Sequence, residues 1–285
     1  MRLDRPLWLL VTVAAATYPA LGLAWCVAAL LIAYPEVRAL GFGGHPLPFF
    51  AMLLVFIGLV AVGNAVRVVA IGLSQTHRFH FWVESRQVAI PGPVAAVVHE
   101  LGLRERVVVV DTRAQIAVTV GLLRPIVVIS TGMAEVLSST ELRAVLAHEQ
   151  AHARRRDPLR VLLARMLAAH LWFLPVAEDV RSRARRGYEL AADRGAAHRY
   201  GRSALAGALL RVMSAPVATQ GFVVPFVDTD LLEARVVQLE SGQAPRPARV
   251  SSIRSALTGA GASGFLAAVA AAWLFVLLAC PCAAT

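Results

Sequence analysis

The sequence predicts a mainly α-helical membrane protein, in which transmembrane helices carry a cytoplasmic α+β domain with a small antiparallel sheet. The first observation behind this prediction is composition: 58% of the residues are hydrophobic and only 16% are charged, whereas soluble domains are about half apolar and about a quarter charged. The second is that the apolar residues gather in long runs near the two ends of the chain. The third is a central region in which short β-branched runs stand among helical patterns.

Three apolar runs are predicted to cross the membrane. A helix needs about 20 residues to cross a hydrocarbon core of about 30 Å. The first run, 7–34, exceeds this length and is too long for the apolar part of a typical signal peptide. The third run, 264–279, is short but dense in Ala, Leu and Val. The predicted organisation is a first transmembrane helix, an external loop, a second transmembrane helix, the large domain, and a third transmembrane helix with a short external tail: 1–34, 35–48, 49–73, 74–261 and 262–285.

The placement of arginine predicts the orientation. All 28 positions counted as Lys or Arg are arginine, and the net charge is +10. Arginines precede the first run, follow the second and precede the third, and the loop between the first two runs has a single one: Arg2 and Arg5; Arg78 and Arg86; Arg246, Arg249 and Arg254; Arg38. The positive-inside rule therefore places 74–261 in the cytoplasm of a multi-pass protein of the bacterial inner membrane. Direct nucleic-acid binding is not expected, because no basic helix is interleaved with aromatic residues.

The region 74–261 is predicted to contain a few strands and several helices. β-branched runs predict strands at 106–111 and 126–130 and, more weakly, at 116–120. Apolar periodicity predicts the helices: 88–102, 139–155, 158–173, 177–200, 203–213 and 229–240. Residues 160–176 are almost wholly apolar, and a buried core helix is favoured over one that enters the membrane, because this run is short and contains arginines.

The helix predicted at 139–155 contains a His-Glu-x-x-His (HExxH) motif, formed by His148, Glu149 and His152. Residues four apart lie on one face of a helix, so both imidazoles can reach one metal ion. Glu149 then lies beside the site, where a base can take a proton from water at the metal. Ser139 is predicted as the N-cap of this helix, without Glu or Gln at the capping-box position.

A zinc peptidase needs a third protein ligand and an open position for water. Glu189 is predicted as that ligand. Asp193, one turn later on the helix predicted at 177–200, is predicted to accept a hydrogen bond from a ligating histidine and so fix its tautomer. Asp157 precedes Pro158 and is interpreted either as a helix N-cap or as a site residue. Three further residues remain alternatives for the third ligand: Glu178, His170 and His198.

Several motifs follow one another along the chain: a strand at 124–130, Glu141-Leu142, the HExxH helix, Arg156-Asp157, Trp172-Phe173-Leu174-Pro175 and Tyr188-Glu189-Leu190-Ala191-Ala192-Asp193. This series resembles the BlaR/MecR-type membrane metallopeptidases, the antirepressor peptidase family, over about 94–211. The Trp-Phe-x-Pro element favours this family over the HtpX/Ste24 type, which shares the HExxH and the later Glu-x-x-x-Asp.

The resemblance implies a gluzincin-like zinc peptidase that acts in signal transduction by cleaving a cytoplasmic protein, often a winged-helix transcriptional repressor of the BlaI type. The chain departs from the best-known members because it has three predicted spans rather than four and ends soon after the last one. An external penicillin-binding sensor domain is therefore not expected, and direct sensing of β-lactams is not implied. The activating signal, self-cleavage and the oligomeric state are left open, with a homodimer as one alternative.

The predicted mechanism is metal-assisted hydrolysis of a peptide bond. Zn²⁺ is held by His148, His152 and Glu189, with water in the fourth position. Glu149 takes a proton from this water and returns it to the leaving amine. An extended substrate is predicted to pair by β-augmentation with a strand formed by Ile126, Val127, Val128 and Ile129. Two other functions remain open: an HtpX/Ste24-like quality-control peptidase acting on membrane proteins, and a non-catalytic membrane sensor that keeps the peptidase fold.

Overall fold

The computed structural model describes residues 8–15, 17, 22, 47–103, 106–214, 229–246 and 251–279. The chain divides into two compact units. The first is formed mainly by Ala70–Leu163 and Arg183–Ala248, and the second by Arg2–Val69, Ala164–Ser182 and Arg249–Thr285. Most of the predicted first transmembrane helix and nearly all of the predicted loop at 35–48 lie outside the described residues.

The first unit contains a four-stranded sheet with the order β1-β2-β4-β3. Its strands are β1 (Gln87–Val88), β2 (Val107–Val110), β3 (Ala117–Val120) and β4 (Ile126–Ser130). β2 and β4 pair in parallel, whereas β1 with β2 and β3 with β4 pair antiparallel. The sheet is therefore mixed, and the prediction of an antiparallel sheet is wrong for its central pair. After β2 the chain forms the edge strand β3 before it returns as β4 beside β2, and apolar runs carry no information on strand direction.

The turn between β3 and β4 requires a glycine. Gly121 has a φ of +94°, which lies in the left-handed region that residues with a Cβ rarely adopt. A Cβ at this position would also lie 2.9 Å from the carbonyl oxygen of Arg124. The tight connection keeps β3 antiparallel to β4 and leaves β3 at the edge of the sheet.

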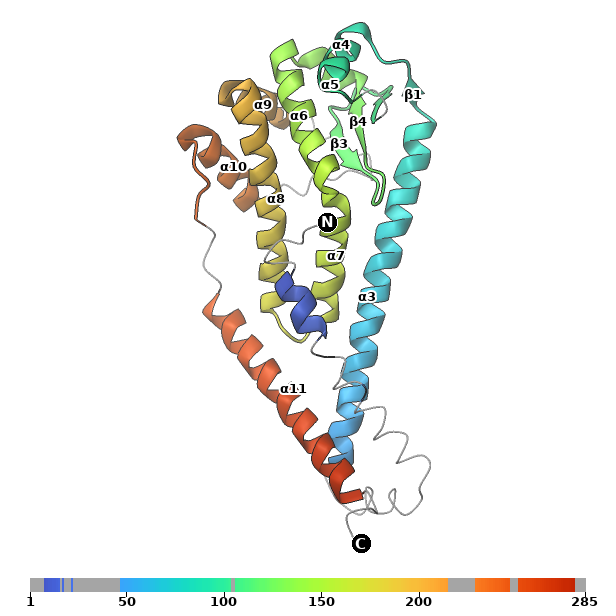
Figure 1. Ribbon diagram of the computed structural model, residues 1–285, viewed down its shortest axis with the longest axis vertical. Helices are drawn as coiled ribbons and strands as arrows, with labels where there is room; N and C mark the ends of the chain where they lie inside the picture. The colour runs from blue at the N-terminus through green and yellow to red at the C-terminus, as the bar shows by residue number, and fades with distance from the viewer. Residues whose placement is uncertain are drawn as a thin grey trace. The chain divides into compact units, whose positions relative to one another are not determined.

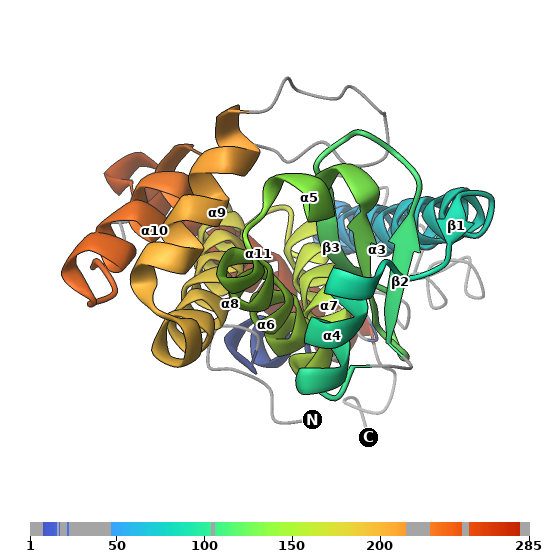
Figure 2. The same ribbon diagram turned by 90° about the horizontal axis from the view of Figure 1, so that it is seen from above.

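Helices cover both faces of this sheet (Figures 1 and 2). Val109 of β2 belongs to a core shared with α4 (Gly92–Glu100) and α6 (Ser139–Arg155). Its neighbour Val110 belongs to a second core, shared with the C-terminal part of α3 (Leu47–Glu84). Alternate residues of a strand point to opposite faces, so burial on both faces explains why the strands are almost continuously apolar.

The mainly helical character is confirmed. The helix predicted at 139–155 is observed as Ser139–Arg155, and the other predicted helices of the central region begin and end within four residues of their predicted limits. Strand β1 and helix α5 were not predicted, because segments of this length are too short to show a periodicity. Besides α4 and α6, the described helices between residues 92 and 241 are α5 (Thr131–Val136), α7 (Asp157–His170), α8 (Val176–Tyr200), α9 (Arg202–Ser214) and α10 (Thr229–Ser241).

Helix α6 has defined signals at both ends. Its N-cap is Ser138, so the prediction of Ser139 is wrong by one residue. The hydroxyl of Ser138 accepts from the backbone N–H of Glu141 at 3.3 Å, and Glu141 Oε2 accepts from the N–H of Ser138 at 2.8 Å. The two bonds form a complete capping box. A prediction that places the N-cap at Ser139 does not reveal it, because Glu141 is then not at the capping-box position. At the other end Arg156 adopts a left-handed φ of 55°, and α7 begins at the next residue, Asp157.

Two helices are long and apolar enough to cross a membrane by length and composition. They are Leu53–Glu84, within α3, and Ser252–Leu274, within α11 (Ser252–Ala279). The predicted second and third spans, 49–73 and 264–279, fall on these helices. Only 17% and 11% of their most apolar windows are buried, whereas a core helix of a soluble protein is mostly buried. The cytoplasmic placement of 74–261 stays a prediction.

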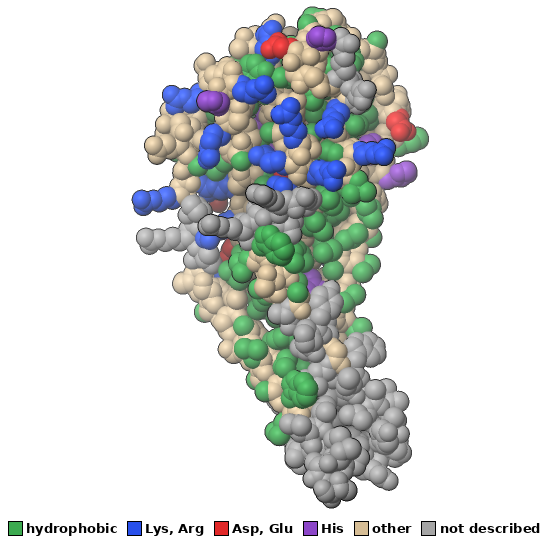
Figure 3. All heavy atoms as spheres, in the orientation of Figure 1, with side chains coloured by type: hydrophobic (Ala, Val, Ile, Leu, Met, Phe, Trp, Pro, Cys, Tyr) green, Lys and Arg blue, Asp and Glu red, His purple; other side chains and the backbone are tan. Residues whose placement is uncertain are grey.

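One face of the first unit is basic. Figure 3 shows many arginine side chains on one face and few acidic ones, in keeping with the net charge of +10. Several acidic side chains of the same unit are instead buried: Glu141, Glu149, Asp157 and Asp193. A buried carboxylate is costly unless it is paired and hydrogen-bonded, so these acids mark the places where the unit has a polar interior.

Candidate metal centre

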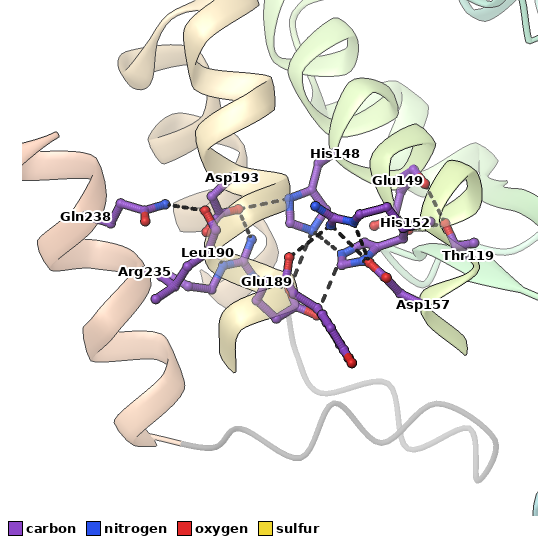
Figure 4. Close-up of polar contacts among 12 residues, drawn as sticks. Thr119, His148, Glu149, His152, Asp157, Glu189, Leu190, Asp193, Arg235 and Gln238 are labelled. Carbon is purple, nitrogen blue, oxygen red and sulfur yellow. Dashed lines mark hydrogen bonds and ion pairs between the residues drawn. The ribbon is translucent and has the colours of Figure 1, made fainter. Parts of the chain in front are cut away.

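Two histidines of α6 face each other in this interior. His148 and His152 are both buried, and their Nε2 atoms lie 3.0 Å apart. Their spacing of four residues places them on one face of the helix, since an α-helix has 3.6 residues per turn. Figure 4 shows both rings pointing toward Glu189 of α8.

Glu189 supplies a third donor to the same point. Its Oε2 lies 3.5 Å from His148 Nε2, and its Oε1 lies 3.7 Å from His152 Nε2. One donor atom from each of the three residues fits within a mutual distance of 4.8 Å. Ligands bound to zinc at 2.0–2.1 Å with tetrahedral angles are separated from one another by about 3.3 Å. The three side chains are therefore spaced so that they can hold a metal ion.

The other nitrogen of each ring contacts a carboxylate. His148 Nδ1 lies 2.9 Å from Asp193 Oδ1, and His152 Nδ1 lies 2.8 Å from Asp157 Oδ2. Ionised carboxylates only accept hydrogen bonds, so Nδ1 of His152, which hydrogen-bonds Asp157, carries the hydrogen when its ring is neutral. The carboxylate 2.9 Å from His148 Nδ1 favours the same tautomer there. The two Nε2 lone pairs then converge on Glu189, an arrangement that is unfavourable unless a cation lies between them.

Asp157 resolves an alternative that the sequence left open. It is the first residue of α7, and its side chain also contacts His152, so it belongs to the centre. Asp157 Oδ2 accepts from Arg155 Nε at 3.1 Å, and Asp157 Oδ1 lies 3.6 Å from Arg160 Nη1. This carboxylate is thus held by two arginines that lie close to it in the sequence.

Asp193 is held from a greater distance along the chain. Arg235 of α10 donates from Nε to Asp193 Oδ2 and from Nη2 to Asp193 Oδ1, both at 2.8 Å. Its Nη1 also lies 3.6 Å from Glu189 Oε2. Sequence reasoning missed Arg235, because nothing in the pattern of α10 distinguishes it from the other arginines of the chain.

The charges around the histidines hold protons on them when no metal is bound. Burial disfavours the charged form of His152, but the carboxylates of Asp157 and Glu189 outweigh burial and raise its pKa to about 10. Burial also opposes charge on His148, and there Asp193 and Glu189 prevail and raise the pKa. Burial disfavours ionisation of Glu189, yet the two histidines lower its pKa well below the ordinary value. The centre thus surrounds positive charge, which a divalent cation can supply in place of protons.

Glu149 lies beside the three donors and is not one of them. It is buried, and the hydroxyl of Thr119 lies 2.8 Å from both its Oε2 and its backbone carbonyl oxygen. Thr119 belongs to β3, so this contact joins the edge strand of the sheet to the HExxH helix. Sequence reasoning missed Thr119, because a threonine in a β-branched run gives no signal of a special role.

The three alternative third ligands lie elsewhere. Among the described residues, the group that can hold a metal contains Glu189 and none of these alternatives. Glu178 pairs with Arg181. His170 lies within hydrogen-bonding distance of Thr17, and His198 is exposed.

The predicted substrate strand requires a correction. Residues Ile126 to Ile129 lie in β4, which pairs with β2 on one side and with β3 on the other. Both hydrogen-bonding edges of β4 are therefore occupied, and a substrate cannot add to it. The strand with an unpaired edge on this side of the sheet is β3, which also carries Thr119.

An HExxH helix with a glutamate contributed by a later helix is the arrangement found in one class of metallopeptidases. The sequence model of the BlaR1 peptidase M56 family matches residues 49–239, which is more than half of the chain. The chain belongs to this family. The resemblance to the BlaR/MecR type is thereby confirmed, and the match extends beyond 94–211 to include most of α3. A search of curated proteins finds no match.

Proposed function

We propose that this chain is a membrane-anchored zinc endopeptidase whose metal is held by His148, His152 and Glu189. The observation that carries the proposal is the convergence of the two Nε2 atoms on Glu189, with each Nδ1 directed at its own carboxylate. Two imidazoles and one carboxylate form a ligand set typical of catalytic zinc, which keeps a further position open. A zinc ion bound there would polarise a peptide carbonyl and lower the pKa of water toward about 7.

Glu149 is the proposed general base. It follows His148 directly and contributes no donor to the metal group, so its carboxylate is available for proton transfer. It takes a proton from the water that attacks the peptide carbonyl and then delivers a proton to the nitrogen of the leaving amine. The hydroxyl of Thr119, 2.8 Å from Glu149 Oε2, keeps one carboxylate oxygen in place while the other reacts.

Strand β3 is the proposed binding edge for an extended substrate. Ser130 N–H donates to the carbonyl of Ile116, and bonded positions alternate along an antiparallel pair. By this alternation the N–H and C=O of Thr119 point away from β4. Val127, which lies opposite Thr119, accordingly donates its N–H to Arg106 on the β2 side. A substrate strand can thus pair with the backbone of the residue whose side chain contacts the base.

Membrane attachment is proposed through α3 and α11, the two helices with the required length and composition. The arginine-rich surface of the first unit fits the cytoplasmic side of a bacterial inner membrane. The proposed substrate is a cytoplasmic protein, and a repressor of the BlaI type is the specific candidate, as the sequence resemblance implies.

The first experiment measures zinc per chain in detergent-purified protein. We expect about one zinc per wild-type chain, as a single catalytic site requires, and a clear loss in Glu189→Ala. Wild-type protein that is free of metal after purification without chelators would contradict the proposal and favour the non-catalytic sensor.

The second experiment measures cleavage of fluorescein-labelled casein, an extended polypeptide probe. Glu149→Gln should keep its zinc and lose cleavage, whereas the control Glu233→Gln, on the exposed side of α10, should cleave like the wild type. Turnover retained by Glu149→Gln would exclude the base assignment. A repressor of the BlaI type and a misfolded membrane protein are then compared as substrates, and a preference for the latter would support the HtpX/Ste24-like alternative.

A further inference from the structure

Helix α10 contributes no metal donor, yet it reaches the metal group through one side chain. The guanidinium of Arg235 forms a two-pronged pair with Asp193, and its remaining nitrogen lies 3.6 Å from Glu189 Oε2. Asp193 is fully buried, at 0% exposure, and Arg235 is largely buried, at 19% side-chain exposure. Figure 4 shows Arg235 entering the centre from α10, between Asp193 and Glu189.

The two prongs fix the orientation of the Asp193 carboxylate. Oδ2 accepts from Arg235 Nε, so the carboxylate plane is set by the planar fork of the guanidinium. Oδ1 accepts from Arg235 Nη2 and is also the atom that faces His148 Nδ1. Rotation of the carboxylate would break the fork and the histidine contact together. Arg235 therefore controls, through Asp193, the direction in which His148 presents Nε2.

Arg235 also balances charge without competing for the metal. Glu189 and Asp193 are two acidic groups on successive turns of α8, and Arg235 is close to both. Because its Nε and Nη2 are committed to Asp193, the guanidinium cannot turn into the space between the histidines without breaking this pair. A lysine has a single charged nitrogen and cannot make the same planar contact.

From these contacts we infer that Arg235 is a positioning residue of the metal centre, and that α10 completes this centre although it provides no ligand. The inference rests on the proposed metal site and goes beyond it. Retention of the metal then depends on the docking of α10 against α8, and removal of the guanidinium weakens metal binding even when the three ligands are intact.

A second contact between the same helices provides a matched control. Gln238, one turn after Arg235, is buried and donates from Nε2 to the backbone carbonyl of Leu190 at 2.8 Å. It fastens α10 to α8 as Arg235 does, but none of its described hydrogen bonds reaches a metal donor. If Arg235 acts only by fastening α10, loss of either side chain should have the same effect on the metal.

The test is the zinc affinity of the full-length protein in detergent, measured by competition with a chromophoric chelator after metal removal. We expect Arg235→Gln to weaken zinc binding by about 10- to 100-fold, the usual effect of losing a group that orients a ligand. Arg235→Lys should restore part of this loss. Gln238→Met, which keeps the side-chain volume, should bind zinc like the wild type even if its unfolding midpoint falls.

The Co²⁺-loaded proteins give a second readout that does not depend on turnover. The visible absorption bands of bound Co²⁺ report the ligand geometry, and we expect them to change in Arg235→Gln and not in Gln238→Met. Wild-type zinc affinity and an unchanged cobalt spectrum in Arg235→Gln would overturn the inference, as would an equal loss of affinity in Gln238→Met. A wild-type protein that binds no zinc would overturn the proposed function as well, whereas zinc binding without cleavage would leave the role of Arg235 standing.

Discussion

The two histidines of the centre are supported in opposite ways. His152 is held by a partner close in the sequence, since Asp157 lies 5 residues further along the chain. His148 is held by Asp193, which in turn is held by Arg235, another 42 residues further on. The two contact distances are nearly the same, at 2.8 and 2.9 Å, although only the His152 contact has the angles of a hydrogen bond. The two sides also differ in how much of the fold each one needs.

The local side of the centre, formed by His152 and Asp157, depends on one helix junction. Once α6 ends at Arg155, with Arg156 as its C-cap, α7 begins and Asp157 is already placed near His152. The distant side, formed by His148, Asp193 and Arg235, requires α8 and α10 to dock. This docking has an entropic cost, because the chain between the contacting residues must be ordered. We therefore expect the His148 side to be the weaker point of the centre, where a perturbation of the tertiary structure first affects the metal.

The largest expected effect is on the distant side. Asp193→Asn replaces a fully buried carboxylate and turns an amide toward Arg235, which then keeps only its 3.6 Å contact with Glu189. Removing one member of a buried pair costs about 3 kcal/mol or more. The free energy of unfolding of the zinc-free protein should fall by this amount in denaturant titrations in detergent, and zinc affinity should fall by about 10- to 100-fold. A change within about 0.5 kcal/mol would show that the Arg235 pair does not stabilise the fold.

The equivalent change on the local side should cost less. In Asp157→Asn the released Arg155 still donates to the carbonyl of Tyr188, and its side chain is 29% exposed, so water can replace the lost contact. The second arginine, Arg160, still lies over the ring of Tyr188. Loss of a hydrogen bond to a charged group is worth about 1.5–3 kcal/mol, and we expect the lower end of this range in the same denaturant titrations. A loss of stability equal to that of Asp193→Asn would remove the distinction between the two sides.

Much of the metal centre was predictable from the sequence, and the reason is physical. Helical periodicity alone places His148, Glu149 and His152 together, and the same rule links Glu189 to Asp193. The position of Arg235 depends on tertiary packing, and no fixed spacing in the sequence relates this residue to the ones that it contacts.

The sheet shows the same limit of prediction from the sequence. The apolar runs predicted three of the four strands correctly, but pairing partners and directions depend on how the chain crosses between them. For this reason the sequence predicts β4 as the substrate strand, although β4 lies in the interior of the sheet. The fold class and the motif could be predicted, whereas the edge strand and the support from α10 required the structure.

The pH dependence of zinc binding should follow the local side. The pKa of His152 is raised to about 10 from an ordinary 6.5, and zinc binds the neutral ring, so affinity should increase with pH across this interval. The same shift stabilises the zinc-free protein fully below about pH 6.5, and this contribution is lost as the pH rises through about 10. Asp157→Asn removes one cause of the shift, so its zinc affinity, measured by chelator competition at several pH values, should depend less steeply on pH. An unchanged slope would contradict the assignment to Asp157.

A smaller effect, on the rate of cleavage, is expected from a change beside the proposed general base Glu149. Thr119→Val keeps the shape and removes the hydroxyl that lies 2.8 Å from Glu149 Oε2. We expect kcat for casein cleavage to fall about tenfold, equivalent to about 1.4 kcal/mol, with little change in KM, because the backbone of β3 is unaltered. Thr119→Ser should recover most of the rate. An increase in KM alone would indicate that Thr119 acts in substrate binding and not on the base.

The smallest expected effect concerns α6 far from both sides. Ser138→Ala removes the hydroxyl that caps the helix, which should lower the free energy of unfolding by about 1 kcal/mol. His148 lies ten residues further along, or about 15 Å at 1.5 Å per residue, so neither histidine contact is disturbed. Zinc affinity should therefore equal that of the wild type, which calorimetry and chelator competition can check together. If zinc affinity falls with this cap, the centre responds to the stability of α6 as a whole, and the comparison of a local with a distant side must give way to one in which the helix itself is the limiting element.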